Sequence, residues 1–139
     1  MKEIVEALAS RLASLGVGTW SPDGVLPLNT TGIVCGIEPD KPDSIIVMNV
    51  YSVTTEPASG DDQYGVQAKV RDKDIESAAD LAEAVILSLD LLGNVSLGDV
   101  RLTKVRLSSV ASLGQDDKGR VSYTLNFYVW RPSTGDMHS

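Results

Sequence analysis

Residues that could perform chemistry are few in this chain. The one histidine, His138, is the penultimate residue, and a general base needs a fixed geometry that a polar tail does not provide. The one cysteine, Cys35, lies in an apolar stretch with no histidine nearby, which favours a buried, inert thiol over a nucleophile. The sequence contains no CxxC, HExxH or GxxxxGKS/T motif. The glycine pair of LGVG follows a predicted helix, whereas a dinucleotide loop follows a strand.

Charged residues offer two further candidates. Adjacent carboxylates occur at Asp61–Asp62 and Asp116–Asp117, but a calcium loop needs several more oxygen ligands in a set pattern. We therefore interpret both pairs as solvated turn residues. Arg101, Lys104 and Arg106 form a small basic group, which is either an exposed sheet face or a contact with an acidic neighbour. We expect no catalytic residue, no metal site and no cofactor.

The strand expected at about 120–131 leaves large side chains without an obvious cover. One of its faces is wholly apolar and carries Val121, Tyr123, Leu125, Phe127 and Val129. The other face carries Ser122, Thr124, Asn126, Tyr128 and Trp130. Apolar side chains also occupy the second face of the strand expected at 44–54, namely Ile45, Val47, Tyr51 and Val53. This surface indicates either a partner protein or a cover formed by the segment around Trp20.

Composition limits the class of protein. The chain has 139 residues, 42% hydrophobic and 22% charged, which predicts a single globular domain with one sizeable core. One cysteine excludes an internal disulfide. The net charge of −7 argues against a broad nucleic-acid surface, which needs clustered basic residues. No segment is typical of a signal peptide or a membrane span.

The elements follow from hydrophobic periodicity and from Gly and Pro positions. Helices are predicted at 2–15 and 75–92, with Asp74 as the N-cap of the second. Strands are predicted at 33–37, 44–54, 64–71, 99–113 and about 120–131. A change of parity between Leu102 and Val105 predicts a bulge or bend near 103–104. The result is an α+β fold: an antiparallel β-sheet of about four to five strands with two helices packed on one face.

Three local expectations complete this interpretation. The apolar face of the last strand should pack against one face of the second helix, formed by Ala78, Ala82, Ile86 and Leu89. The 55–62 loop has little to bury and should be mobile until a partner orders it. The polar tail from about 132 should be flexible.

The second half of the chain resembles a known group of proteins. The stretches YGVQAKVRDKD, ESAADLAEAVILSL and SLGQDDKGRVSYTLNFYVWRPS resemble small proteins of tailed bacteriophages that are called minor capsid, tail-completion or tail terminator-like proteins. LASLGVGTW and CGIEPDKPDSIIVMNVY fit the same group, so the resemblance covers most of the chain.

The resemblance implies a structural protein without enzymatic activity. Such proteins form a hexameric ring of identical subunits that caps the tail tube and joins it to the head connector, with DNA passing through the hole without specific binding. The implied location is the head–tail junction of the virion, after synthesis in the host bacterial cytoplasm. The implied partners are therefore further copies of the chain, the tube protein and the connector or neck protein, and no membrane. An acidic or neutral lumen would favour DNA passage.

Two groups of residues are the candidates for a subunit or partner interface. Tyr128 and Trp130, with Arg101, Lys104 or Arg106, are expected at a contact between subunits where the basic residues meet acidic ones. The acidic candidates in or beside the 55–62 loop are Glu56, Asp61 and Asp62. Two alternatives stay open: another head–tail joining (neck) protein, and a monomeric small-molecule binding domain or enzyme.

Overall fold

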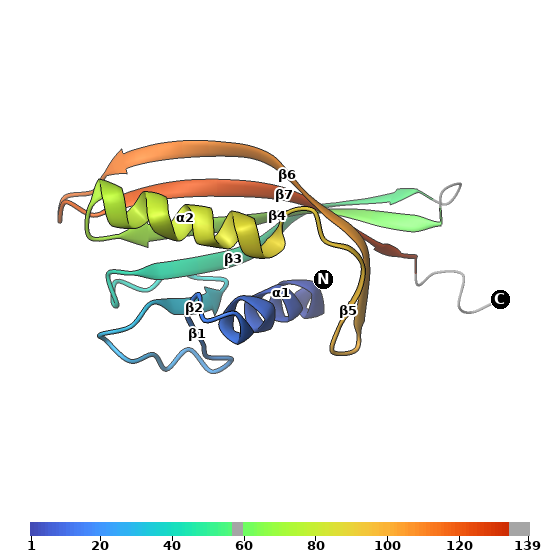
Figure 1. Ribbon diagram of the computed structural model, residues 1–139, viewed down its shortest axis with the longest axis horizontal. Helices are drawn as coiled ribbons and strands as arrows, with labels where there is room; N and C mark the ends of the chain where they lie inside the picture. Colours follow the sequence, from blue (N-terminus) through green and yellow to red (C-terminus); the bar gives the residue numbers. More distant parts are fainter. Residues whose placement is uncertain (57–59, 134–139) are drawn as a thin grey trace.

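The computed structural model describes residues 1–56 and 60–133. In chain order the elements are α1 (Lys2–Ser14), β1 (Thr19–Trp20), β2 (Gly32–Cys35), β3 (Ile45–Glu56), β4 (Asp61–Asp72), α2 (Ile75–Leu89), β5 (Gly93–Leu97), β6 (Val100–Gln115) and β7 (Val121–Pro132). Figure 1 shows one curled sheet with both helices on the same side of it.

The sheet is mixed and has seven strands in the order β1-β2-β3-β4-β7-β6-β5. The pairs β1–β2 and β2–β3 are parallel, and the remaining four pairs are antiparallel. The prediction of an antiparallel α+β sheet of four to five strands was therefore wrong, because the protein is mostly β with a mixed seven-stranded sheet that curls into a half-barrel.

Two short strands and one connection explain why the sequence did not predict the number and direction of the strands. The strands β1 and β5 have only two and five residues and bury little, so their sequences lack hydrophobic alternation. Residues 36–44 have the composition of a turn, but they carry the chain back so that β3 starts beside the start of β2. A parallel pair needs such a return connection, whereas a tight turn makes an antiparallel one.

The helices begin and end for local reasons. The apolar stripe of α1 is buried through Ile4, Val5, Leu8 and Leu12. Asp74 caps α2 as predicted, since its side chain accepts a hydrogen bond from the backbone N–H of Ser77 at 2.7 Å. The helix α2 ends at Leu89 and not at residue 92, because Asp90 is extended and Leu91 has a positive φ of 65°.

The core lies between the helices and the concave face of the sheet. Phe127 is 0% exposed and shares one cluster with Leu125 and Val129 of β7 and with Ala82 and Leu89 of α2. This burial confirms the predicted parity of β7. Neither described helix is long and apolar enough to cross a membrane.

The long hairpin strands differ from their predicted bounds. The strands β3 and β4 extend to Glu56 and Asp61, so the predicted 55–62 loop is mostly strand, and residues 57–59 lie outside the described residues. The strand β7 runs to Pro132, and most of the predicted tail, with His138, also lies outside them. Bulges in the β6–β7 ladder lie at Leu107/Ser109 and Ser112/Gly114 and not near 103–104. The ladder with β7 begins at Lys104, and the earlier part of β6 pairs with β5 instead.

Candidate interaction surface

The outer face of the sheet, opposite the helices, is polar at its centre. Across three strands, the Gln67 side chain donates to Asn126 at 3.2 Å, and Asn126 donates to the Ser109 hydroxyl at 3.0 Å. These bonds link the three side chains to one another across the sheet.

An aromatic pair lies next to this row, nearer the end of β7. The rings of Tyr128 and Trp130 are 5.9 Å apart with an interplanar angle of 56°. The Nζ of Lys104, which is opposite Trp130 in the β6–β7 register, lies 4.4 Å from the centre of the Trp130 ring. That distance is within cation–π range. Tyr128 remains 37% exposed and Trp130 is half-buried.

Tyr51 joins this pair because of a bulge and a glycine. The β3–β4 register shifts between Val50 and Ser52, so Tyr51 is the extra residue of a bulge. A Cβ added at Gly65 would lie 2.6 Å from the Tyr51 ring, which shows that the ring covers this glycine. Gly65 is also opposite Tyr128. Burial raises the pKa of Tyr51, and neighbouring Tyr128 raises it further. Tyr51 is nevertheless 53% exposed.

We call Tyr51, Lys104, Tyr128 and Trp130 the outer aromatic patch. Tyr51 was recognised in the sequence as part of an uncovered face but was not included among the candidate interface residues. The signal that could have linked it to Tyr128 is Gly65, a glycine inside an otherwise alternating strand, which often marks a bulge or a close approach.

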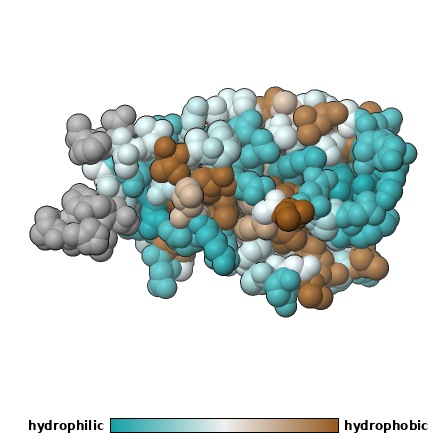
Figure 2. All heavy atoms as spheres, turned by 180° about the vertical axis from the view of Figure 1, so that it is seen from behind, coloured by the Kyte–Doolittle hydropathy of each residue, from teal (hydrophilic) through white to brown (hydrophobic). Residues whose placement is uncertain are grey.

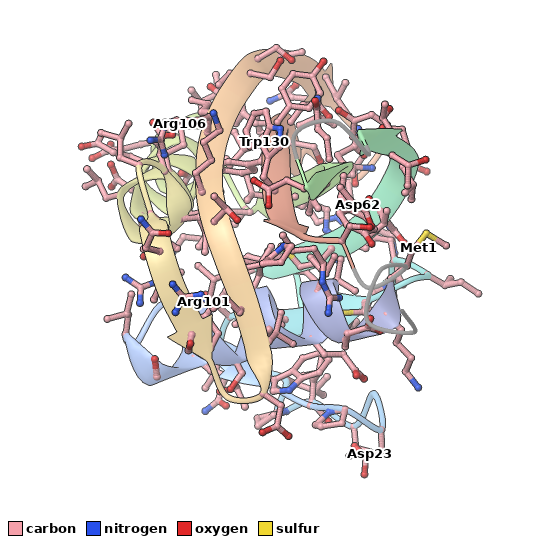
Figure 3. All side chains as sticks on the ribbon, turned by 90° about the vertical axis from the view of Figure 1, so that its right-hand side faces the viewer. Met1, Asp23, Asp62, Arg101, Arg106 and Trp130 are labelled. Carbon is pink, nitrogen blue, oxygen red and sulfur yellow. The ribbon has the colours of Figure 1, made fainter. Side chains whose placement is uncertain are left out.

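The three basic candidates do not form one group. Arg106 donates to the backbone oxygens of Leu92 and Val105 at 3.0 and 2.7 Å, so its guanidinium is held within the chain. Figure 3 places Arg106 and Trp130 beside the upper part of β6 and Arg101 well below them, toward the β5–β6 turn. Arg101 is exposed. Of the three, only Lys104 belongs to the patch.

The acidic candidates lie where β4 pairs with the end of β7. Asp61 accepts a hydrogen bond from the Thr103 hydroxyl at 3.3 Å. Asp62 is buried, and its Oδ1 has no hydrogen-bond partner within the part of the chain that the structure describes. The side chain of Glu56 lies outside the described residues. The acidic residues therefore lie at the same end of the sheet as Trp130, since Asp62 and Gln63 oppose Arg131 and Trp130.

The segment after β1 covers only another part of the outer face. Leu26 packs against Val34, Ile45 and Val47, which form a small second core. Trp20 packs against the main core on the other side. Among the described residues, neither covers the outer aromatic patch. Figure 2 views this face and shows its hydrophobic residues in several small, separate groups.

Two buried arginines hold the 36–44 connection. Arg71 is almost fully buried and donates to Glu38 and to the backbone oxygens of Asp40, Pro42 and Asp43. Arg120 is also buried and pairs with Asp40, Asp43 and Asp116. Composition gave no indication of this cluster. Its charges are satisfied within the chain, so it explains the path of the connection, not a binding site.

Hydrogen bonds and charges from two lysines and from Arg120 lower the pKa values of two carboxyl groups in this connection. A hydrogen bond from Lys118 lowers the pKa of Asp40, with a further contribution from Arg120. A hydrogen bond from Lys41 likewise lowers the pKa of Asp43, and Arg120 adds to it.

The structure offers no arrangement suited to catalysis in its described residues. Burial raises the pKa of Cys35 to about 11, so its thiol is unreactive near neutral pH. Groups of three or more His, Cys, Asp or Glu that could hold a metal are absent from the described part. Two open hollows of about 520 and 530 Å³ lie beside α1 and beside the 28–31 segment. In the second, the Ser44 hydroxyl donates to the Asp72 carboxylate at 3.0 Å, but no histidine lines either hollow to complete a Ser–His–acid arrangement.

The fold is a curled, mixed seven-stranded sheet that exposes the outer aromatic patch on the face opposite the helices. A family model described as "Bacteriophage tail terminator protein" matches residues 11–130. The chain therefore belongs to the bacteriophage tail terminator family, which confirms the resemblance found in the sequence. As a member of this family it is a structural protein of the phage virion, located at the tail.

Solved structures contain the same fold. A chain from the structure described as "Virion of native gene transfer agent (GTA) particle" matches with a TM-score of 0.55 and 11% sequence identity. The match covers 73% of this chain and 78% of that one. At this identity the likeness shows the shared fold. A comparison with curated proteins gave no match.

Proposed function

We propose that this protein is the subunit of a hexameric ring that caps the tail tube and joins it to the head connector. The family match over residues 11–130 supports a tail terminator role. The observation that carries the self-assembly step is the outer aromatic patch, in which three rings and a lysine lie together on a part of the outer face that no described element covers. Aromatic side chains are favoured at the centres of protein interfaces.

A ring follows from a head-to-tail contact. Identical subunits that meet through two different surfaces close into a ring when the rotation between them closes. The patch is one such surface. In this proposal the partners beyond the ring are the tail tube protein and the connector or neck protein, and Glu56 and Asp61 at the same end of the sheet meet a partner's basic groups. Asp62 is buried within the subunit and does not contribute to that contact. DNA passes through the lumen unbound, which suits a net charge of −7.

Light scattering across a salt series tests self-assembly. The native chain should form a species several times the mass of the monomer, weakened but not abolished by salt, since salt screens exposed charges more than apolar contacts. Trp130→Ala should shift the population toward monomer, while Leu28→Ala, another exposed apolar residue, should not. Circular dichroism must show that both variants stay folded. A native chain that is monomeric at high concentration in low salt would show that assembly is not intrinsic.

Another head–tail joining protein is the nearest alternative, because it would use the same kind of surface. A monomeric small-molecule binding protein is less well supported, since the hollows beside α1 and beside the 28–31 segment are open and have mixed linings. Binding to tail tubes in a pull-down distinguishes a terminator from a neck protein that binds only the connector.

A further inference from the structure

Two segments of long strands have an open hydrogen-bonding edge. The strand β5 pairs with β6 only as far as Lys104, and the Leu107 N–H is satisfied by the Asp90 side chain at 2.8 Å. Beyond it, every residue of 108–115, the β6 edge segment, is exposed.

On the opposite side of the sheet, β2 pairs with β3 only as far as Met48. The following residues 50–55 are the β3 edge segment, and 51–55 are exposed. Among the described residues, no strand pairs with either segment on its open side.

Neither segment has the usual chemical protection of an edge. Isolated edges are commonly protected by charged residues or proline, because unpaired backbone groups invite another strand. The two segments read SSVASLGQ and VYSVTT and contain no charged residue and no proline, although 22% of the chain is charged. Bulges bend both segments, and bending is the one protection that they retain.

The two edges have complementary directions. Each of the pairs β3–β4, β4–β7 and β7–β6 is antiparallel, so β3 and β6 run in opposite directions at opposite sides of the sheet. A second copy placed in the same orientation would therefore set its β3 antiparallel to β6 of the first. The segments are also similar in length, with six and eight residues. These features favour a second copy over an unrelated strand.

The register fixes how far the copies must slide. Ala111, at the middle of the β6 edge segment, opposes Thr124 of β7. Thr124 opposes Lys69 of β4, and Lys69 opposes Val47 of β3, so Ala111 and Val47 lie in the same row across the sheet. The middle of the β3 edge segment, Ser52, opposes Gly65, which is four residues from Lys69 along β4, because Tyr51 is the extra residue of a bulge. The second copy must therefore shift by roughly 14 Å, at about 3.4 Å per residue. A sheet that closes on itself needs such a stagger, because its strands are oblique to the axis.

We infer that, in the assembled ring, the β3 edge segment of one subunit pairs antiparallel with the β6 edge segment of the next, so that the sheet continues from subunit to subunit. This inference rests on the proposed function and specifies the contact that builds the ring. It also covers Tyr51, which lies on the β3 edge segment and adjoins Tyr128. The neighbouring β6 strand would place Ser109 and Ala111 beside that end of the outer aromatic patch.

Disulfide trapping tests this pairing. In a Cys35→Ser background, Ser52→Cys with Ala111→Cys places thiols that should meet only between subunits. Within one chain these two Cα atoms are separated by three strand spacings across the sheet and by the stagger along the strands, which together give about 20 Å. A disulfide needs Cα atoms within about 7 Å. Mild oxidation should give a ladder of covalent oligomers. Ser52→Cys with Ser109→Cys or with Leu113→Cys tests neighbouring registers. The matched control is Ser52→Cys with Asp117→Cys, which lies in the exposed β6–β7 turn.

Measuring the native mass of the same samples separates the proposed edge pairing from the proposed tail terminator role. A ring in which at least one register variant cross-links well above the control supports the edge pairing. A ring of the expected mass in which no register variant exceeds the control would overturn the edge pairing and leave the terminator role intact. A chain that stays monomeric both alone and with tail tubes, and forms no covalent ladder, would overturn both. Circular dichroism of each reduced variant shows that the subunit is folded.

Discussion

Phe127 is the largest of the fully buried side chains and lies where β7 faces α2. Replacing it with alanine should lower the free energy of unfolding by about 3–5 kcal/mol, through lost burial and the cavity left behind. Tyr128→Ala, the next residue on the outer face, should cost much less because Tyr128 is partly exposed. Urea denaturation of both variants measures the difference. Equal losses would contradict the assigned faces of β7.

The carboxylates that pair with Lys118, Lys41 and Arg120 predict acid sensitivity. The carboxyls of Asp40, Asp43 and Asp116 have pKa values lowered from an ordinary 3.8 in the folded protein. A lowered folded pKa contributes stability that is present above the unfolded pKa and is lost as pH falls through the folded one. The urea midpoint of the native chain should therefore fall below about pH 4.

Arg120→Gln tests whether the lowered pKa values of these carboxyls cause the acid sensitivity. It should lower the urea midpoint at pH 7 and reduce part of the further loss between pH 5 and pH 3. Arg120 contacts all three carboxylates, but Lys118 and Lys41 lower the pKa values of Asp40 and Asp43 more strongly and are still present in the variant. Arg101→Gln, at an exposed arginine, should leave both quantities nearly unchanged. An unaltered acid slope in Arg120→Gln would mean that other groups cause the acid sensitivity.

At the level of residues, the sequence predicted burial better than it predicted contacts. The alternation of β7 identified Phe127 as core and Trp130 as outer, because strand periodicity alone determines the face. The partners of Arg106 and Arg71 could not be predicted, because they are backbone oxygens brought close only by the chain path. Likewise, nothing local indicated that Tyr51 would lie over Gly65.

Among the elements, α2 offers a direct test of local structure. The Asp74 carboxylate accepts the Ser77 N–H, so Asp74→Ala should destabilise the protein by about 1 kcal/mol through loss of the cap. Asp80→Ala removes an exposed carboxylate from the middle of the same helix and should change stability by less than about 0.5 kcal/mol. Thermal denaturation followed by circular dichroism compares them. If the two variants melt alike, the cap does not stabilise the helix.

Elements with strong periodicity were predicted, and elements defined by tertiary pairing were not. Both helices and the four long strands carry enough apolar spacing to be recognised. The strands β1 and β5 exist because a neighbour offers an edge, and that information is not in two or five residues of sequence. The parallel β2–β3 pair depends on the 36–44 connection, which Arg71 and Arg120 hold from other strands. The mixed sheet was therefore beyond prediction from local pattern.

At the scale of the whole molecule, resemblance supplied what residue patterns did not. Composition and absent motifs argued only for a surface-acting protein, whereas the sequence stretches around 64–74 and 112–133 led to the family that the match over 11–130 confirms. The hexameric ring, its partners and its contact residues remain proposals that the geometry supports through the outer aromatic patch and the two open edges.

Electron microscopy of the purified protein, alone and mixed with purified tail tubes, tests the central claim most directly. We predict ring-shaped particles of six subunits and, in the mixture, rings seated at one end of each tube. The outer aromatic patch should be covered by a neighbouring subunit in averaged images of sufficient detail. Monomers that leave both ends of the tubes bare would contradict the account.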